Sequence, residues 1–448
     1  MKNLIKRISI LLLFPLAFTC CDLLDSEDPP SAEEELQRMM PYTQYLISYW
    51  TGTDNARFAL QWTQQIGGVR GVHLDVDKYD LKPEYLNTVW DLYYQYIFAD
   101  LATMIDHATR SDSKAYRGIC RILKAYSIGM MTDAWGDIPY EYGLNKYGAY
   151  DEQQFIIITI YELLGQAIVD LDAAENSQGF KPGPDEDLIY GGDLHKWKRA
   201  ANVIRLRYLL RMERYNDILN HIGADELFTS NNDNMLYYFP GGDRVNPHYY
   251  FDNRFKNTRA GKYIVNLLKD NNDPRLPVYI RLNNNNEYVG TGPGEALSSA
   301  SYLSSHIASE ESPVMHLTYS EQKFIEAEAY FHTEQQSLAD QAYEEAVKAS
   351  LSLHDVSDAE WEAEHAAVED VTLEQIITAK YVALFLDPEV WADFRRTGYP
   401  ELQPYDHEDN PDAQIPRRYL YPEDQQTWNY MNVPEDVTIY DRVWWDQE

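Results

Sequence analysis

The carboxylates of Asp75, Asp77 and Asp80 are spaced like the first ligands of a calcium-binding loop. Acids at alternating positions can surround a hard cation with oxygen ligands. Such a loop also needs glycine at its sixth position and glutamate at its twelfth, and these positions hold Asp80 and Leu86. Zinc-type His-Glu-x-x-His and paired-cysteine motifs do not occur in the sequence either. We therefore expect solvated acids here, and predict neither a metal site nor a cofactor.

Motifs for nucleophilic or phosphate chemistry are equally sparse. The glycine-rich stretch 290–294 is followed by no Lys-Ser/Thr pair, and Pro293 lacks the amide hydrogen that would hold phosphate. No Gly-x-Ser-x-Gly elbow occurs, and the 11 histidines indicate no catalytic triad. Glycoside hydrolysis needs only two carboxylates about 5 to 10 Å apart, which sequence does not reveal. We predict no catalytic residues, with a secreted helical glycoside hydrolase as an alternative.

The N-terminus has the pattern of an export signal followed by a reactive cysteine. A basic leader precedes an apolar run at 8–18 that is too short to span a bilayer. Cys20 stands where a lipoprotein signal peptidase would cut, and Cys21 is the alternative acylation site; an ordinary secretory signal is the other interpretation. We predict a lipoprotein signal peptide at 1–19, and a lipidated cysteine with a flexible acidic tether at 20–40.

Bulk composition limits the partners. The chain has 72 Asp and Glu against 38 Lys and Arg, and its net charge of −34 repels phosphate backbones. We therefore exclude nucleic acid as a partner. Tyr residues number 36 against 14 Phe, so many rings carry a polar tip suited to half-wet surfaces or to the rim of a core. Beyond the N-terminal pair Cys120 stands alone, so packing must stabilise the fold without disulfides.

The elements that must position any site are helices. Apolar and aromatic residues recur at helical spacing in seven stretches: 84–107, 114–131, 155–174, 196–214, 319–332, 338–351 and 372–385. The fifth and sixth stretches interlock small and aromatic residues like a tetratricopeptide-type pair. Residues 225–314 instead hold Asn, Gly and Pro clusters typical of long loops. We predict that 41–448 forms one mostly α domain, in which helical hairpins with tetratricopeptide-like repeats form a scaffold and long irregular loops pack on it.

Several segments resemble, in the same order, the motifs of SusD/RagB family lipoproteins. They are Cys20-Cys21-Asp22-Leu23-Leu24-Asp25, Thr132-Asp133-Ala134-Trp135-Gly136-Asp137-Ile138-Pro139-Tyr140, Tyr190-Gly191-Gly192-Asp193, Glu326-Ala327-Glu328-Ala329-Tyr330, Trp391-Ala392-Asp393-Phe394-Arg395-Arg396 and Ile415-Pro416-Arg417-Arg418-Tyr419. The resemblance spans almost the whole chain. We expect the arginines of these motifs to bind acids and helix C-termini inside the fold, and the tryptophans to pack.

The resemblance implies an outer-membrane lipoprotein at the cell surface that performs no chemistry. Proteins of this family bind an oligosaccharide, or a peptide in the RagB branch, and pass it to a SusC-like TonB-dependent transporter. The resemblance therefore implies carbohydrate binding for glycan uptake, with RagB-type peptide uptake as the alternative form of nutrient binding.

Ligand-contacting positions of the family lie outside these motifs, so they cannot be transferred to this chain. Flat rings stack on the apolar faces of sugars while nearby polar groups satisfy the hydroxyls. We predict that aromatic residues outside the helical stripes contact the ligand together with polar partners. These residues are Trp50, Trp62, Tyr249 and Tyr250, with Asp54, Arg70 and Asn246.

Overall fold

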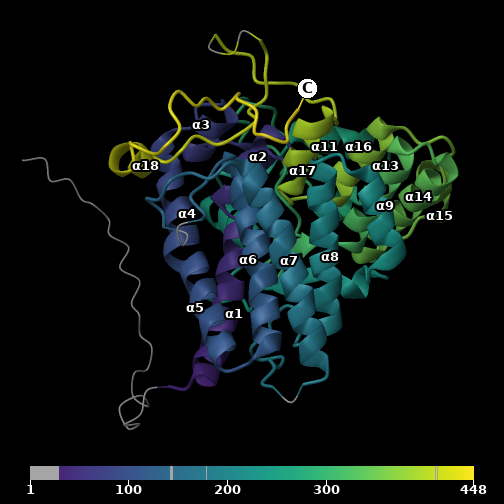
Figure 1. The fold of residues 1–448 in the computed structure, drawn as a ribbon. Coiled ribbons are helices and arrows are strands. Elements are labelled where there is room, and N and C mark those ends of the chain that lie inside the picture. The colour runs from purple at the N-terminus through teal and green to yellow at the C-terminus, as the bar shows by residue number, and fades with distance from the viewer. Residues whose placement is uncertain (1–29, 142–144, 178, 409, 411, 448) are drawn as a thin grey trace, which may run out of the picture.

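The computed structural model describes residues 30–141, 145–177, 179–408, 410 and 412–447. The predicted mostly α fold is confirmed, because helices form most of the body and two short antiparallel strand pairs complete it (Figure 1). Cys20, Cys21 and the predicted signal peptide lie outside the described residues.

Five long helices form a bundle in the N-terminal half (Figure 1). They are α1 (Ala32–Thr51), α5 (Phe98–Arg110), α6 (Lys114–Trp135), α7 (Gln153–Glu175) and α8 (Leu194–Arg211). α6 is buried along most of its length because α5, α7 and α8 pack around it. The close approach of α8 requires Gly129, where a Cβ atom would lie 1.8 Å from the Tyr208 hydroxyl. α7 is long and apolar enough to cross a membrane, but in this fold it packs against α6 and α8.

α1 begins earlier than the sequence analysis predicts. Ser31 and Glu34 form a capping box, in which the Glu34 side chain accepts a 2.7 Å hydrogen bond from the Ser31 amide. Leu36 and Met40 are completely buried against the core. The prediction of a flexible tether through residue 40 is therefore wrong from Ala32 onward, because this segment has both a cap and an apolar face to bury.

The predicted helix at 84–107 changes its winding along its length. It starts as the 3-10 turn η1 (Pro83–Leu86), continues as α4 (Asn87–Leu92) and widens into the π turn η2 (Tyr93–Ile97) before α5. Tyr93 and Tyr94 are both buried, so the wider turn brings adjacent aromatic residues to the core face.

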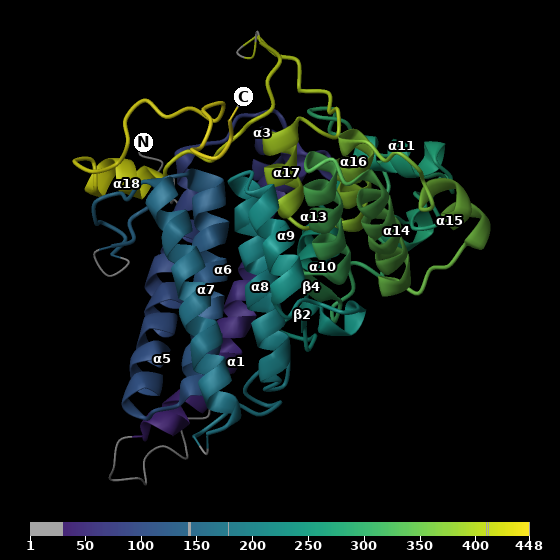
Figure 2. The same ribbon diagram turned by 45° about the vertical axis from the view of Figure 1, so that its right-hand side comes forward.

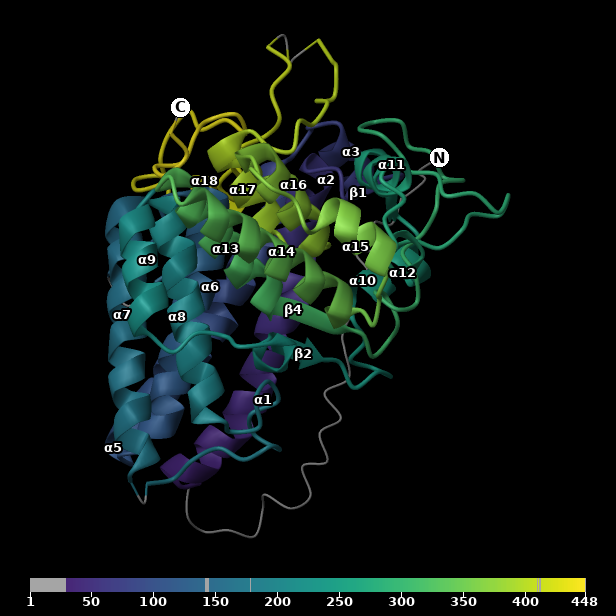
Figure 3. The same ribbon diagram turned by 90° about the vertical axis from the view of Figure 1, so that its right-hand side faces the viewer.

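The helices that follow α8 in the sequence pack beside the bundle (Figures 2 and 3). They are α9 (Tyr215–Ala224), α13 (Tyr319–His332), α14 (Gln336–Leu353), α15 (Ala359–His365), α16 (Leu373–Ala383), α17 (Glu389–Thr397) and α18 (Glu423–Trp428). α13 and α14 form the predicted tetratricopeptide-like hairpin, in which Ala327, Ala342 and Ala346 are buried at the helix contact. α18 and the C-terminal segment lie across one end of the bundle (Figure 1).

Two strand pairs attach the long loops to the helices. β2 (Met235–Tyr238) pairs with β4 (Pro313–Leu317), and β1 (Ile66–Gly68) pairs with β3 (Thr258–Ala260). The short elements around them are α2 (Asp54–Trp62), α3 (Val72–Asp77), η3 (Asn231–Asp233), α10 (Pro247–Tyr249), η4 (Tyr250–Phe255), α11 (Lys262–Asp270) and α12 (Leu276–Tyr279). The β2–β4 pair therefore brings together the two ends of the predicted loop region.

Charged residues of α8, α13 and α17 form an ion network inside the fold. Arg207 Nε donates to Glu321 Oε1 of α13 at 2.8 Å. Arg211 donates two hydrogen bonds, of 2.8 and 2.6 Å, to Glu389 of α17. Burial opposes the charge on Glu389, but Arg207 and Arg211 hold the pKa of that carboxyl below its ordinary value. This network joins the bundle to the C-terminal helices.

The arginines of the sequence motifs take the expected structural roles. Arg396 pairs with Glu328 of α13, and Arg417 pairs with Asp446. Arg418 donates to the last carbonyl of α6, at a helix C-terminus. The Arg396–Glu328 and Arg417–Asp446 pairs connect segments that are far apart in the sequence.

We expect Glu389→Gln to lower the free energy of unfolding by about 3 kcal/mol, because Arg207 and Arg211 lose a carboxylate they share inside the protein. Urea unfolding followed by circular dichroism measures this change. Glu344→Gln, which breaks the exposed Glu344–Lys348 pair on α14, is the control and should cost less than about 1 kcal/mol. Unchanged stability of Glu389→Gln would contradict the role given to the network.

Candidate ligand-binding surface

The segment that contains α10 and η4 presents a run of aromatic side chains. Asn246 caps α10, because its Oδ1 accepts from the amides of His248 and Tyr249 at 2.8 and 3.1 Å. The π turn of η4 follows directly, and Lys256 ends it with a left-handed backbone, φ 57°. Figure 3 shows α10, α11 and α12 on one side of the molecule with long loops around them.

Tyr250, Phe251 and Phe255 form a cluster of rings, here termed the aromatic patch. The ring centroids of Tyr250 and Phe255 are 4.8 Å apart, and those of Tyr250 and Phe251 are 5.5 Å apart. Tyr250 and Phe251 are half-buried, and Phe255 is 47% exposed. Clustered rings with exposed faces on a turn offer a flat apolar contact for a ligand.

Arg57 of α2 supports the patch from inside the protein. Its guanidinium carbon lies 3.6 Å from the centroid of the Phe251 ring, and its Nη2 donates to Asn257 Oδ1 at 3.3 Å. Arg57 is only 1% exposed, so it orients Phe251 and does not reach solvent. The neighbouring His73 is also buried; this burial, followed by the charge of Arg57, holds the pKa of His73 well below its ordinary value.

Four arginines near the aromatic patch are here termed the arginine edge: Arg70, Arg254, Arg259 and Arg281. The Arg254 guanidinium carbon lies 5.6 Å from the Tyr250 ring centroid, and the charges of Arg70 and Arg281 act on Arg259. Tyr302 contacts two of them, since the guanidinium carbons of Arg259 and Arg281 are 3.8 and 4.5 Å from its ring centroid. Arg281 Nη2 also donates to Asn253 Oδ1 of η4 at 3.1 Å. The surface thus combines exposed rings with guanidinium donors for hydroxyl or charged groups of a ligand.

A buried carboxylate lies next to the arginine edge. Asp252 is 1% exposed, and its Oδ2 accepts a 3.2 Å hydrogen bond from the Leu303 amide. Burial raises the pKa of Asp252 to about 7, although Arg281, Arg259 and Arg57 act in the opposite direction. Asp252 therefore titrates near neutral pH.

The structure brings three of the seven predicted ligand residues to this region. Tyr250 belongs to the aromatic patch, and Arg70 follows β1 as an exposed member of the arginine edge. Tyr249 is half-buried, and its hydroxyl donates to Glu310 Oε1 at 3.0 Å. These three positions stay predicted ligand contacts.

The other predicted residues lie elsewhere or are enclosed. Trp62 is completely buried between Trp391 and Tyr419, and Asn246 is also fully buried, so neither side chain can touch a ligand in this conformation. Their aromatic and amide groups complete the core and a helix cap instead. Trp50 is half-buried at the end of α1, and the Asp54 side chain lies outside the described part of the structure.

Phe251, Phe255, Arg281 and Tyr302 are not among the ligand residues predicted from the sequence. The first two stand within seven residues, 249–255, of which four are aromatic. Such a run outside any helical stripe was the available signal. No local sequence pattern indicates Arg281 or Tyr302, because only tertiary contacts bring them to η4.

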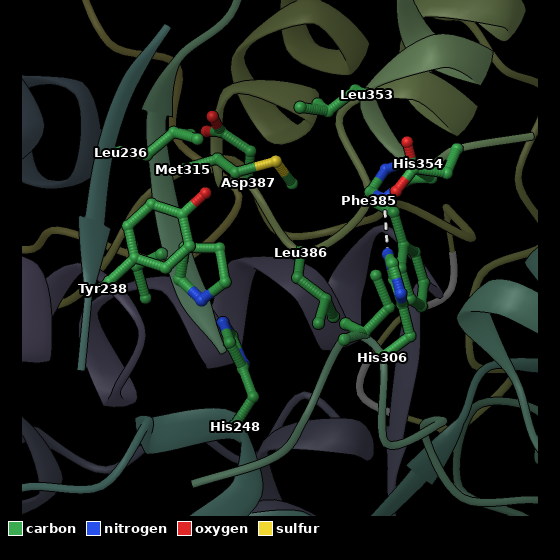
Figure 4. Close-up of a pocket in the computed structure, with 14 residues that line it drawn as sticks. Leu236, Tyr238, His248, His306, Met315, Leu353, His354, Phe385, Leu386 and Asp387 are labelled. Atoms are coloured by element: carbon green, nitrogen blue, oxygen red, sulfur yellow. Dashed lines mark hydrogen bonds between the residues drawn. The ribbon is translucent and has the colours of Figure 1, made fainter. Parts of the chain in front are cut away.

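A partly open pocket lies between β2, β4 and the loops at His306 and Leu386 (Figure 4). Its volume is about 260 Å³, and its walls include His248, His306, His354, Leu386 and Asp387. His306 Nε2 and His354 Nδ1 are 3.2 Å apart, and Leu386 lies between this pair and the wall formed by β2. Burial lowers the pKa of His354 to about 3 and raises that of Asp387 to about 8. The His354 ring is therefore uncharged at neutral pH.

Asp75 and Asp77, two of the acids spaced like calcium ligands, form hydrogen bonds within the fold. Asp75 accepts a 2.8 Å hydrogen bond from the Tyr85 hydroxyl. Asp77 accepts from the amides of Gly68 and Gly294, and so ties the glycine-rich stretch to β1. Across the described part of the chain, no three His, Cys, Asp or Glu side chains are grouped to hold a metal ion.

Helical hairpins that carry long loops define the class of protein: a mostly α scaffold with irregular loops packed on it. Residues 30–422 match the SusD-like family described as "Starch-binding associating with outer membrane". The chain therefore belongs to the SusD-like family. A search of curated proteins finds no match.

Solved structures share this fold at low sequence identity. A structure described as a chitin-binding protein is 24% identical with a TM-score of 0.80, covering 92% of this chain and 100% of its own. A SusD homolog from Bacteroides uniformis is 20% identical with a TM-score of 0.79, covering 92% and 99%. A chitin-binding SusD homolog from Flavobacterium johnsoniae is 21% identical with a TM-score of 0.78, covering 93% and 98%. These likenesses establish the fold.

We expect Asp252→Asn to remove one component of the pH dependence of stability. In the unfolded chain Asp252 loses its proton near pH 4, whereas in the folded protein it keeps the proton until about pH 7. The unmodified protein should therefore lose stability as the pH rises through this window, relative to the variant. Urea unfolding of both proteins at pH 4.5 and pH 8 measures the difference. Asp106→Asn, at an exposed ion pair of α5, is the control; a pH-independent difference for Asp252→Asn would contradict the assignment.

Proposed function

We propose that the protein is a cell-surface glycan-binding lipoprotein, which captures an oligosaccharide and passes it to a SusC-like TonB-dependent outer-membrane transporter. The observation that carries this proposal is the aromatic patch, with guanidinium donors beside it, on a rigid helical body. Membership of a family described by starch binding and outer-membrane association supports it. Two solved structures of the same fold are also described as chitin-binding.

The chemistry of the patch suits a sugar chain. The apolar face of a pyranose ring can stack on Tyr250 or Phe255, and each such contact contributes modestly. Donors at the border, such as Arg281 and the Tyr302 hydroxyl, can satisfy sugar hydroxyls that lose water on binding. Because the surface is open, a polymer can lie across it without being threaded. Weak and open binding suits a protein that must release its ligand to a partner.

A binding role also fits the acids near the patch better than hydrolysis does. A glycoside hydrolase needs two carboxyl groups that face the glycosidic bond from opposite sides. Asp252, the carboxylate enclosed beside η4, is 1% exposed and is held by the Leu303 amide. Glu310 accepts the Tyr249 hydroxyl instead of facing the patch rings. We therefore propose that the protein binds glycans without cleaving them.

Removing rings from the aromatic patch should weaken glycan binding. We expect Tyr250→Ala and Phe255→Ala each to lower affinity about 5- to 10-fold, because each ring contributes about 1 kcal/mol of stacking. Isothermal titration calorimetry with oligosaccharides found by a glycan array provides the measurement. Trp428→Ala, at an exposed ring on α18, should leave affinity unchanged.

Unchanged affinity of both patch variants would remove this surface from the proposal. Binding of peptides alone would favour the RagB-type alternative. Release of shortened sugars by the purified protein would overturn the proposal in favour of a hydrolase.

The predicted anchor can be tested by separate cysteine variants. We expect Cys20→Ala to abolish acylation and to release the protein from the membrane fraction, because the lipid is attached to this sulfur. Mass spectrometry of the mature N-terminus and membrane fractionation measure both effects. Cys21→Ala is the matched control, and should remain anchored. The opposite pattern would assign the lipid to Cys21, and a protein unaffected by both changes would contradict lipid anchoring.

A further inference from the structure

The arginine edge concentrates positive charge on a strongly acidic protein. The whole chain carries a net charge of −34, yet Arg70, Arg254, Lys256 and Arg281 are all exposed around η4. Two of them, Arg254 and Lys256, are only two residues apart. A local surface of this sign attracts anions within about 8 Å at physiological salt, whereas the distributed negative charge is screened beyond that distance.

These arginines differ from others in the fold by lacking carboxylate partners. Arg207 pairs with Glu321, and Arg275 pairs with Asp273. In contrast, no ion pair joins any arginine of the edge to a carboxylate among the described residues. Arg259 instead donates to the backbone carbonyls of Ser298, Lys256 and Thr258, and Arg281 to the amide oxygen of Asn253.

The positive charges also act on one another. Burial lowers the pKa of Arg259; Tyr302 and Asp252 oppose this effect, and Arg70 and Arg281 add to it. Asp252 compensates the edge only in part, because it is enclosed and its Oδ1 has no hydrogen-bond partner among the described residues. The edge is therefore a set of neighbouring guanidinium groups whose mutual repulsion a bound anion would relieve.

We propose that the ligand of this surface is an anionic oligosaccharide, whose sugar rings stack on the aromatic patch while its acidic groups bind Arg70 and Arg281. This inference rests on the proposed glycan-binding function. The planar guanidinium fork matches both carboxylate and sulfate oxygens, so uronic acids and sulfate esters present the same chemistry to the edge. Stacking would select the sugar chain, and the arginines would select its charge.

The test compares matched oligosaccharides by calorimetry at 50 and 300 mM salt. The probes are an oligogalacturonate, its neutral methyl ester and a sulfated galactan oligosaccharide; the first and third distinguish carboxylate from sulfate. We expect the unmodified protein to bind at least one charged probe at least 10-fold more tightly than the ester, and this preference to shrink at high salt. Tighter binding of the ester would overturn the inference and leave the proposed function intact.

Variants locate the effect on the edge. Arg70→Gln with Arg281→Gln should lower affinity for the charged probe at least 10-fold and change affinity for the ester less than twofold. Arg38→Gln with Arg110→Gln removes the same two charges from exposed positions of α1 and α5, and should change neither affinity. Arg70→Gln alone is included because the Arg70 side chain makes no described contact that folding would need. Equal loss in both double variants would reduce the effect to net charge and overturn the inference.

Binding of an acidic peptide, polyglutamate, is measured as a further comparison. Binding of polyglutamate with no binding of any sugar would overturn both the anionic-glycan inference and the glycan-binding function. Binding of a charged sugar with no binding of polyglutamate supports both, because it shows that charge alone is insufficient.

Discussion

Arg207 ties β4, where the long loop segment ends, to the helical body. Its guanidinium binds Glu321 of α13 and also donates to the His316 carbonyl of β4 at 3.2 Å. The His316 ring is bound in turn by Ser48 of α1 and Tyr126 of α6. A charge inside the protein has to be neutralised there, and the cost of leaving it unpaired selects one arrangement of these helices. The position of β4, and of the loops that end at it, follows from that arrangement.

The helices could be predicted because their signal is local. Apolar spacing predicts α6, α7, α8, α13 and α14, because each helix must bury one face. The predicted ends of these helices differ from the observed ends by no more than a few residues. The start of α1 is predicted too late, because an acidic first turn is also typical of a solvated tether. In the structure, the capping box of Ser31 and Glu34 and the burial of Leu36 stabilise a helix there. Pairing of β1 with β3 could not be predicted, because strands of three residues carry no periodicity.

The candidate site was predictable only where its residues adjoin in the sequence. Tyr250 and Arg70 could be selected by residue type, but Arg281 and Tyr302 reach η4 through contacts that no local pattern encodes. Trp62 shows the opposite case. The sequence pattern predicts a loop aromatic, yet Trp391 and Tyr419, more than 300 residues away in the chain, enclose it. Whether a ring faces solvent is decided by such distant partners.

Because β2 pairs with β4, the two ends of the segment between them, residues 239–312, lie next to each other. Its buried side chains, among them Ile264, Val265 and Leu268, share a core cluster with Leu60 and Tyr381 of the body, so a replacement segment must keep these contacts and the register of β3 with β1. In engineering terms the segment is a cassette. Exchanging it between relatives of this fold would move the aromatic patch as one unit while the helical body is kept.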